Sequence, residues 1–282
     1  MLASPPEFPG CIAFIGGGNM ARSLISGLIA DGVPPPSIRV AEPVAVLREA
    51  LQHDFGVEVF AENAIAGAAA ATWVLAAKPQ VLREVCEGLA AQVQRQRPLL
   101  VSIAAGITTV QLDRWLHGNV AIVRAMPNIP ALLGAGISAL FANAQVDAAG
   151  RQCAERLLAA AGRTVWLGDE SQLDAVTAVS GSGPAYLFLL AESMLAAAQS
   201  EGLSSDVARV LVLQTILGAA RMLTEENATP EELRDRVTSP GGTTQAAIDV
   251  FQAGGFDRMV ADAIRAATER GRQLSLANDR NG

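Results

Sequence analysis

Residue types that carry most acid–base and nucleophilic chemistry are scarce in this sequence. It has one tyrosine, two histidines and, among 21 basic residues, a single lysine, Lys78. His53 falls between two predicted elements and His117 lies at a predicted helix end, so both are interpreted as surface residues. No Gly-x-Ser-x-Gly turn follows a predicted strand. These shortages argue against a Ser-His-Asp hydrolase.

Cysteines and positive charge are also in short supply. Cys11, Cys86 and Cys153 are far apart and form no Cys-x-x-Cys pair. We therefore expect reduced thiols in a cytoplasmic protein and no metal site. The formal net charge of -7 argues against a nucleic-acid partner, which would require a basic face.

Neither a targeting signal nor a membrane span is predicted. Residues 1–10 hold three prolines and no basic region, so we expect a disordered tail and no signal peptide. The most apolar stretch, Val207 to Leu223, contains Arg209 and Arg221. Charged residues are costly inside a bilayer, so this stretch is expected to be a buried helix of a soluble protein.

Residues 11–168 alternate short apolar runs with helical patterns, which indicates a mostly parallel sheet covered by helices. The expected strands are Cys11–Ile15, Ile38–Ala41, Thr72–Ala77, Leu99–Ile103, Val120–Arg124, Ile137–Phe141 and Arg163–Leu167. A helix is expected from Met20 to Ala30, and the alanine-rich stretch 66–71 is also expected to be helical. The fold class is therefore α/β of the Rossmann type.

Residues 169–282 show helical periodicity and no convincing strand, so a second, all-α domain is expected. Helices are predicted from Ser182 to about Gln199 and from Ser204 to about Leu223. Thr229 and Glu232 have the spacing of a capping box. The two longest of these helices lack a polar stripe, and a helix that is apolar all round must be buried all round. We therefore expect a second subunit to cover them.

The glycine run that follows the first strand is the clearest functional motif. Gly16-Gly17-Gly18-Asn19-Met20-Ala21 fits G-x-G-x-x-A and opens a helix. Gly16 permits a tight turn, Gly18 lets the backbone approach a pyrophosphate, and Ala21 allows close packing of helix on strand. The helix N-terminus then presents N–H groups to the anion.

Other candidates follow the later strands. Glu42, 24 residues after Gly18, is near the usual position of the carboxylate that binds an adenosine ribose, although a solvated loop carboxylate before Pro43 explains it equally well. Ala76-Ala77-Lys78-Pro79 ends the Thr72 strand. Ser102 to Gly106 and Arg124 to Asn128 also follow strands and should face the same crevice, because ligands of open α/β sheets bind outside the carboxyl ends of the strands.

A last motif precedes a helix in the second domain. It is Thr238-Ser239-Pro240-Gly241-Gly242-Thr243-Thr244. Two glycines free the backbone to turn N–H groups outward, and the hydroxyls add donors. We interpret it as a carboxylate site; the alternative is a capped loop between helices, which would need only one hydroxyl.

Taken together, the motifs resemble the pyrroline-5-carboxylate reductase family. The segments that carry the resemblance are Ile15–Met20, Ala76–Pro79, Ser102–Gly106, Arg124–Asn128, Val179–Tyr186 and Ser239–Thr244. The resemblance extends from about Ile12 to about Leu274. It implies reduction of 1-pyrroline-5-carboxylate to L-proline by NADPH or NADH, the last step of proline synthesis. It also implies a homodimer with interlocking helical domains, in some members assembled into a ring of dimers.

The resemblance also implies roles for individual residues. Those expected to hold the dinucleotide are Ile15, Gly16, Gly17, Gly18, Asn19, Met20, Asn63, Ala76, Ala77, Lys78, Pro79 and Glu170. Those expected to hold the cyclic imine are Gly241, Gly242, Thr243 and Thr244, with the Thr244 hydroxyl on the ring nitrogen. Family members that prefer NADPH usually carry serine or threonine near Glu42. We therefore expect both cofactors to be used, with NADPH less favoured than in those relatives.

Two other functions fit part of the sequence. A β-hydroxyacid dehydrogenase also joins a Rossmann domain to a helical one, but the families it resembles use a lysine in the second domain, and none follows Lys78. A dinucleotide-sensing regulatory protein would retain Gly16 and Gly18 but would not need the Gly242–Thr244 site.

Overall fold

The computed structural model describes the backbone of residues 10–280 and side chains as far as residue 276. Apart from Gly10, the predicted N-terminal tail lies outside the described residues. Contacts divide the chain into two compact units, residues 182–266 and the remainder, so the last part of the C-terminal helix belongs to the first unit.

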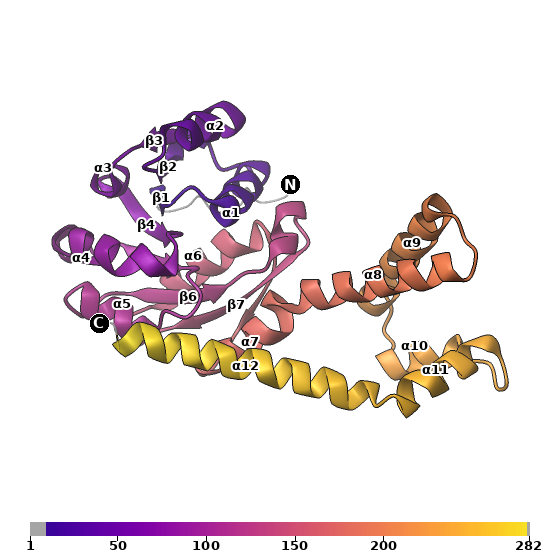
Figure 1. Ribbon diagram of the computed structural model, residues 1–282. Helices are drawn as coiled ribbons and strands as arrows, with labels where there is room; N and C mark the ends of the chain where they lie inside the picture. The colour runs from indigo at the N-terminus through magenta and orange to yellow at the C-terminus, as the bar shows by residue number, and fades with distance from the viewer. Residues whose placement is uncertain (1–9, 281–282) are drawn as a thin grey trace. The chain divides into compact units, whose positions relative to one another are not determined.

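The first unit is built around an eight-stranded sheet (Figure 1). Its strands are β1 (Cys11–Ile15), β2 (Ile38–Ala41), β3 (Glu58–Phe60), β4 (Ala70–Leu75), β5 (Leu99–Ser102), β6 (Ile122–Met126), β7 (Gly136–Ala142) and β8 (Gly162–Trp166). The spatial order is β3-β2-β1-β4-β5-β6-β7-β8. Only the β6–β7 pairing is antiparallel, which confirms the mostly parallel sheet.

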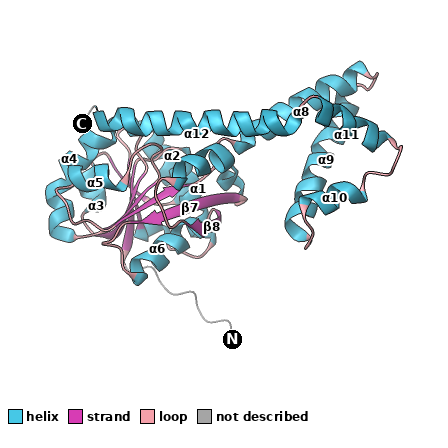
Figure 2. Cartoon of the chain, turned by 90° about the horizontal axis from the view of Figure 1, so that it is seen from below, coloured by secondary structure: helices cyan, strands magenta, loops and turns pink. Residues whose placement is uncertain are grey.

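Helices cover both faces of this sheet, as Figure 2 shows. The α-helices of the unit are α1 (Asn19–Ala30), α2 (Ala45–Phe55), α3 (Asn63–Gly67), α4 (Pro79–Gln96), α5 (Thr109–Trp115), α6 (Ala148–Ala159) and α7 (Gln172–Val176). Short turns are η1 (Pro35–Ser37), η2 (Ile129–Leu133) and η3 (Thr177–Gly181), the last a π-helix.

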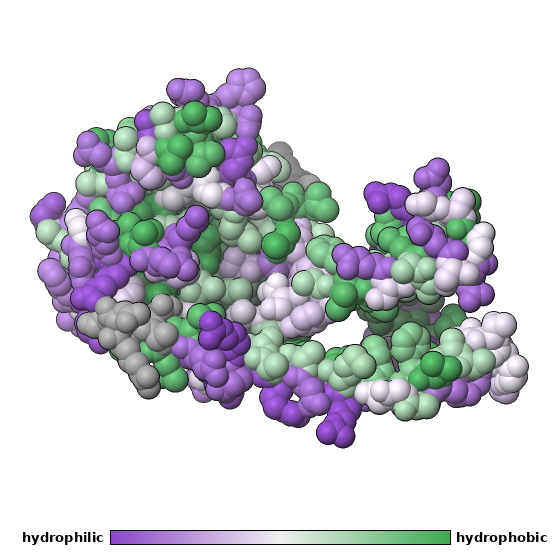
Figure 3. Space-filling view, viewed as in Figure 1, coloured by the Kyte–Doolittle hydropathy of each residue, from purple (hydrophilic) through white to green (hydrophobic). Residues whose placement is uncertain are grey.

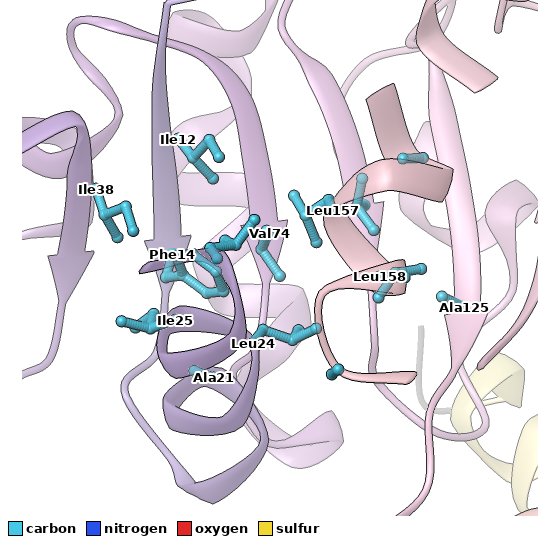
Figure 4. Packing of buried hydrophobic residues seen from close by; sticks show 14 of the residues in the cluster. Ile12, Phe14, Ala21, Leu24, Ile25, Ile38, Val74, Ala125, Leu157 and Leu158 are labelled. Carbon is cyan, nitrogen blue, oxygen red and sulfur yellow. The ribbon is translucent and has the colours of Figure 1, made fainter. Parts of the chain in front are cut away.

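The core has two layers because successive strand residues point to opposite faces of the sheet. Ile12 and Phe14 of β1 pack against α1 and α6, where Leu24 and Leu157 are fully buried (Figure 4). Ala13 and Ile15 of the same strand belong to the second layer, together with the helices α3, α4 and α5. The strand ends are therefore held rigidly between two helical layers.

The second unit is all-helical. It comprises α8 (Gly183–Ser200), α9 (Ser205–Glu225), α10 (Pro230–Arg236), α11 (Thr243–Ala253) and the first part of α12 (Phe256–Arg280). The predicted capping box is present at α10. Thr229 Oγ1 accepts the Glu232 N–H at 3.2 Å, and Glu232 Oε2 accepts the Thr229 N–H at 2.7 Å. No strand occurs between residue 169 and residue 280, the last one described.

The structure corrects several sequence-based expectations. The short strand β3 was missed, because three residues at a sheet edge carry too little periodicity. The stretch 66–71 is not one helix, since α3 ends at Gly67 and Ala70 pairs with Cys11 in the sheet. The strands expected at Thr72–Ala77 and Val120–Arg124 lie two residues away, at Ala70–Leu75 and Ile122–Met126.

The contacts also divide the chain later than the expected change at residue 169. Residues 170–181 pack with the sheet unit, where Leu173 and Ala178 are buried.

Candidate active site

The glycine-rich turn joins β1 to α1. Gly16 has a φ of 108°, a backbone conformation that side-chain-bearing residues rarely adopt, and its N–H donates to the Ala41 carbonyl at 2.9 Å. A Cβ on Gly16 would lie 2.8 Å from the carbonyl carbon and oxygen of Ala76. Glycine at this position is therefore required by the fold itself.

Gly18, in contrast, is not required by the backbone geometry. It is the N-cap of α1 with an ordinary φ of -69°, no side chain caps the helix there, and a Cβ added to it would meet nothing within 4 Å. Glycine here keeps an approach to the first turn of α1 open. An uncapped helix N-terminus beside open space fits a pyrophosphate, so the turn suits a dinucleotide.

Glu42 lies directly after β2 and is only 7% exposed. Its Oε2 accepts the Gly17 N–H at 3.1 Å, and its Oε1 accepts the Val44 N–H at 3.1 Å. The carboxylate is thus attached to the glycine-rich turn, which excludes the alternative of a solvated loop residue. Asn63 begins α3, shortly after β3, whose Phe60 pairs with Ala41 at the same sheet edge.

The end of β4 supplies the next candidates. Ala76 donates its N–H to the Ile15 carbonyl at 2.9 Å, so this segment lies beside the glycine-rich turn. Lys78 is the N-cap of α4, and Pro79 occupies the first turn. Lys78 therefore places a positive charge at the same edge of the sheet as Gly18.

Glu170 connects the middle of β6 to the first turn of α5. Its carboxylate accepts the Thr109 N–H at 2.8 Å and the Thr109 hydroxyl at 2.6 Å. It also accepts a hydrogen bond from Arg124 Nη1 at 3.1 Å, and the Arg124 side chain is only 7% exposed. Arg124, the first residue of the Arg124–Asn128 segment, is therefore paired within the protein.

These contacts indicate that Glu170 positions α5 and β6. Replacing it with glutamine should leave Arg124 without its counter-ion and lower the free energy of unfolding by about 2 kcal/mol, measured by urea denaturation. Binding of NAD(P)H should change little. Asp169→Asn is the control, because that neighbouring carboxylate is exposed and accepts hydrogen bonds from Ser171 alone, from its N–H and its side chain. Weaker dinucleotide binding with unchanged stability would instead assign Glu170 to the cofactor.

The side chains of two further residues near strand ends form hydrogen bonds within the protein. Ser102 is fully buried and its Oγ accepts the Ala104 N–H at 3.4 Å. Asn128 donates to the Ser180 carbonyl at 3.1 Å and accepts the Ile137 N–H at 3.0 Å. Their amide and hydroxyl groups therefore shape the loops of this edge. The sequence offered no signal for these partners, because the spacing of one segment does not show which other segments it meets.

The second unit contains the Thr238–Thr244 loop. Gly241 has a φ of 70°, and Gly242 is the N-cap of the eleven-residue helix α11 with no side-chain cap. The Thr238 hydroxyl donates to the Arg234 carbonyl at 2.6 Å and is therefore bonded to the last turn of α10. Thr243 and Thr244 occupy the first turn of α11. The loop thus presents backbone donors and threonine hydroxyls together.

No group of three or more metal-ligating side chains occurs within the described residues. Two of the three thiols are also poorly suited to reaction, since burial raises the pKa of Cys86 to about 12 and raises that of Cys153.

A Rossmann-type sheet with an open glycine-rich turn defines a dinucleotide-binding protein. Two family models match the chain. One is described as pyrroline-5-carboxylate reductase dimerisation and covers residues 170–274; the other, NADP oxidoreductase coenzyme F420-dependent, covers residues 11–106.

Curated relatives cover nearly the whole chain. The pyrroline-5-carboxylate reductase of Pseudomonas aeruginosa is 52% identical over 94% of this chain and 96% of its own length. That of Haemophilus influenzae is 44% identical over 93% and 97%. This chain belongs to the pyrroline-5-carboxylate reductase family and is an NAD(P)H-dependent oxidoreductase.

Solved structures of pyrroline-5-carboxylate reductases also align with this chain over most of its length. A pyrroline-5-carboxylate reductase from Coxiella burnetii aligns with a TM-score of 0.90 at 40% identity, over 94% of this chain and 98% of that one. The Plasmodium falciparum enzyme, solved with NADP bound, aligns with a TM-score of 0.84 at 26% identity, over 96% and 100%.

Proposed function

We propose that this chain reduces 1-pyrroline-5-carboxylate to L-proline with NAD(P)H, as the last step of proline biosynthesis. The observation that carries the assignment of the substrate site is the Gly241–Thr244 loop, where an uncapped helix N-terminus and two threonine hydroxyls occur together. Such a loop suits a carboxylate with a polar atom beside it.

The residues of each unit take separate tasks. In the first unit, Gly16, Gly17, Gly18, Asn19 and Met20 bind the dinucleotide pyrophosphate, assisted by the Ala76–Pro79 segment. In the second, Gly241, Gly242 and Thr243 bind the substrate carboxylate, and Thr244 orients the ring nitrogen. When bound, NAD(P)H supplies the hydride.

Little acid–base assistance is needed from the protein. A cyclic imine bound as its iminium already accepts hydride well, which agrees with a chain poor in histidine, tyrosine and lysine. The main contribution of these residues is to hold the reacting groups in a productive orientation.

The function is tested by consumption of NAD(P)H with the cyclic imine. A β-hydroxyacid dehydrogenase would instead reduce dinucleotide with a hydroxyacid, and a regulatory sensor would bind dinucleotide without turnover. Formation of proline, measured directly, distinguishes the proposed reaction from both.

Thr244→Ala should lower kcat/KM for the cyclic imine by about tenfold to a hundredfold, which corresponds to about 1–3 kcal/mol for a lost hydrogen bond in a partly buried site. Binding of NAD(P)H, measured by fluorescence titration, should not change. Thr238→Ala is the matched control, because that hydroxyl is already bonded to Arg234. An unchanged kcat/KM in the Thr244 variant would remove this residue from the site.

The working form is proposed to be a homodimer, located in the cytoplasm, that binds neither nucleic acid nor membrane. In this single chain α8 and α9 expose large apolar side chains, among them Leu189 at 64% and Val210 at 67%. Figure 3 shows apolar surface on the helices of this unit. Whether dimers assemble further into a ring is a question for sedimentation analysis.

A membrane is the alternative cover for these helices. The segments Gln172–Ser200 and Ser205–Glu225 are both long and apolar enough to cross one, by length and composition. They carry Glu192, Arg209 and Arg221, however, and charged residues are expensive at membrane depth. Burial against the same helices of a second copy requires no such cost, which favours the dimer.

A further inference from the structure

The adenosine end of the dinucleotide site contains one fixed negative charge. The Glu42 carboxylate is held by the N–H groups of Gly17 and Val44, one on each oxygen. A carboxylate oxygen can accept two hydrogen bonds, so each oxygen retains capacity for one more. Two further hydrogen-bond donors, placed side by side, would fill the remaining acceptor positions of this carboxylate.

Arg39 and Arg48, the basic residues nearest to Glu42 in the sequence, already hydrogen-bond other groups of the protein. Arg39 donates from Nε to the Ala66 carbonyl at 2.9 Å and from Nη1 to Glu58 at 2.7 Å. Arg48 donates from Nη1 to the carbonyl oxygens of Glu42 and Pro43, both at 2.7 Å. Neither guanidinium hydrogen-bonds the Glu42 carboxylate. Arg39 is paired with Glu58, whereas Arg48 donates to neutral carbonyl oxygens and keeps its charge.

The N-terminus of α2, where a phosphate would bind favourably, is already occupied by the Glu42 carboxylate. The first turn of α2 follows β2 directly, and its N-cap, Val44, has no side-chain cap. The Glu42 carboxylate accepts the Val44 N–H and so already supplies an anion at this helix N-terminus. The side chains of Val44 and Val46 are 51% and 71% exposed and offer no donor.

We propose that the adenosine end of this site selects NADH over NADPH and that Glu42 is the residue that decides it. The two adjacent hydroxyls of an unphosphorylated ribose supply the donors that the carboxylate lacks, whereas a 2′-phosphate brings nearly two negative charges against it. This inference rests on the proposed NAD(P)H-dependent function. It assigns to this chain a cofactor preference opposite to the one suggested by its NADP-bound Plasmodium relative.

The test measures binding of NAD⁺ and NADP⁺ by calorimetry, without the cyclic imine, alongside kcat/KM for NADH and NADPH. Wild-type protein should bind NAD⁺ at least about tenfold more tightly than NADP⁺. Glu42→Gln, which retains shape and removes charge, and Glu42→Ser should each move the ratio about tenfold toward NADP⁺. Glu49→Gln removes the same charge from α2 outside the glycine-rich turn and should leave the ratio unchanged.

Each remaining outcome has a definite meaning. Tighter binding of NADP⁺ by the wild type, or a ratio that Glu42→Gln does not move, overturns the selectivity. Arg48→Gln should not weaken NADP⁺; if it does, Arg48 binds the 2′-phosphate and the proposal fails. Failure to bind either dinucleotide would overturn the proposed function as well, which separates the two conclusions.

Discussion

Replacing Leu189 and Leu213 together with glutamate is expected to abolish dimerisation and reduce the reductase activity by more than about a hundredfold. Both leucines are exposed in the single chain, at 64% and 43%, on α8 and α9, which contact each other. Burying each leucine in an interface contributes about 1.5–3 kcal/mol. An unpaired carboxylate in the same place costs several kcal/mol.

The measurement is sedimentation velocity with circular dichroism on the same samples. The control is Gln199→Glu with Ser200→Glu, which adds two charges at exposed polar positions near the end of α8. The control should remain a dimer with normal activity. A leucine variant that stays dimeric and active, or a wild type that is a stable folded monomer, would contradict the proposed assembly.

Two alanine substitutions in the glycine-rich turn should differ in their effects on the free energy of unfolding. Gly16→Ala combines a left-handed backbone conformation with contact against the Ala76 main chain, neither of which can relax easily. We expect it to lower the free energy of unfolding by about 3–4 kcal/mol. Dinucleotide binding should be lost with it, because the turn changes shape.

Gly18→Ala should leave stability nearly unchanged, since its φ is ordinary and its Cβ would meet nothing within 4 Å. It should still weaken NAD(P)H binding by about tenfold or more, because the added methyl group occupies the approach reserved for the pyrophosphate. Urea denaturation and calorimetry on both variants separate folding from binding. Normal dinucleotide affinity in Gly18→Ala would show that the pyrophosphate does not approach this residue.

The order and type of the elements could be predicted because they follow from local patterns. The limits of β1 and β2 were predicted correctly. Apolar periodicity and capping residues are properties of a few neighbouring positions, so they can be recognised in the sequence without knowledge of the tertiary structure. The two long helices α8 and α9 were predicted as apolar on nearly every face, and both expose large apolar side chains in the single chain. Their burial against a second subunit stays a prediction.

Partners far apart in the sequence could not be predicted in the same way. Glu170 was expected near the cofactor by resemblance alone, and its actual partners, Thr109 and Arg124, are 61 and 46 residues away. Within the Ser102–Gly106 segment, the sequence did not show that the Ser102 side chain is fully buried. Which polar groups meet depends on strand register and on how loops pack, and neither is encoded in the spacing of one segment.

The sequence by itself therefore determined the Rossmann-type first half, the helical second half and the segments that meet at the carboxyl edge of the sheet. Only the tertiary structure decided which residues of that edge are committed to the protein and which remain open to a ligand. Glu42 illustrates the difference: its spacing predicts a ribose carboxylate or a loop residue equally well. The bond to Gly17, 25 residues earlier, places it beside the glycine-rich turn, because that contact exists only once β1 and β2 have paired.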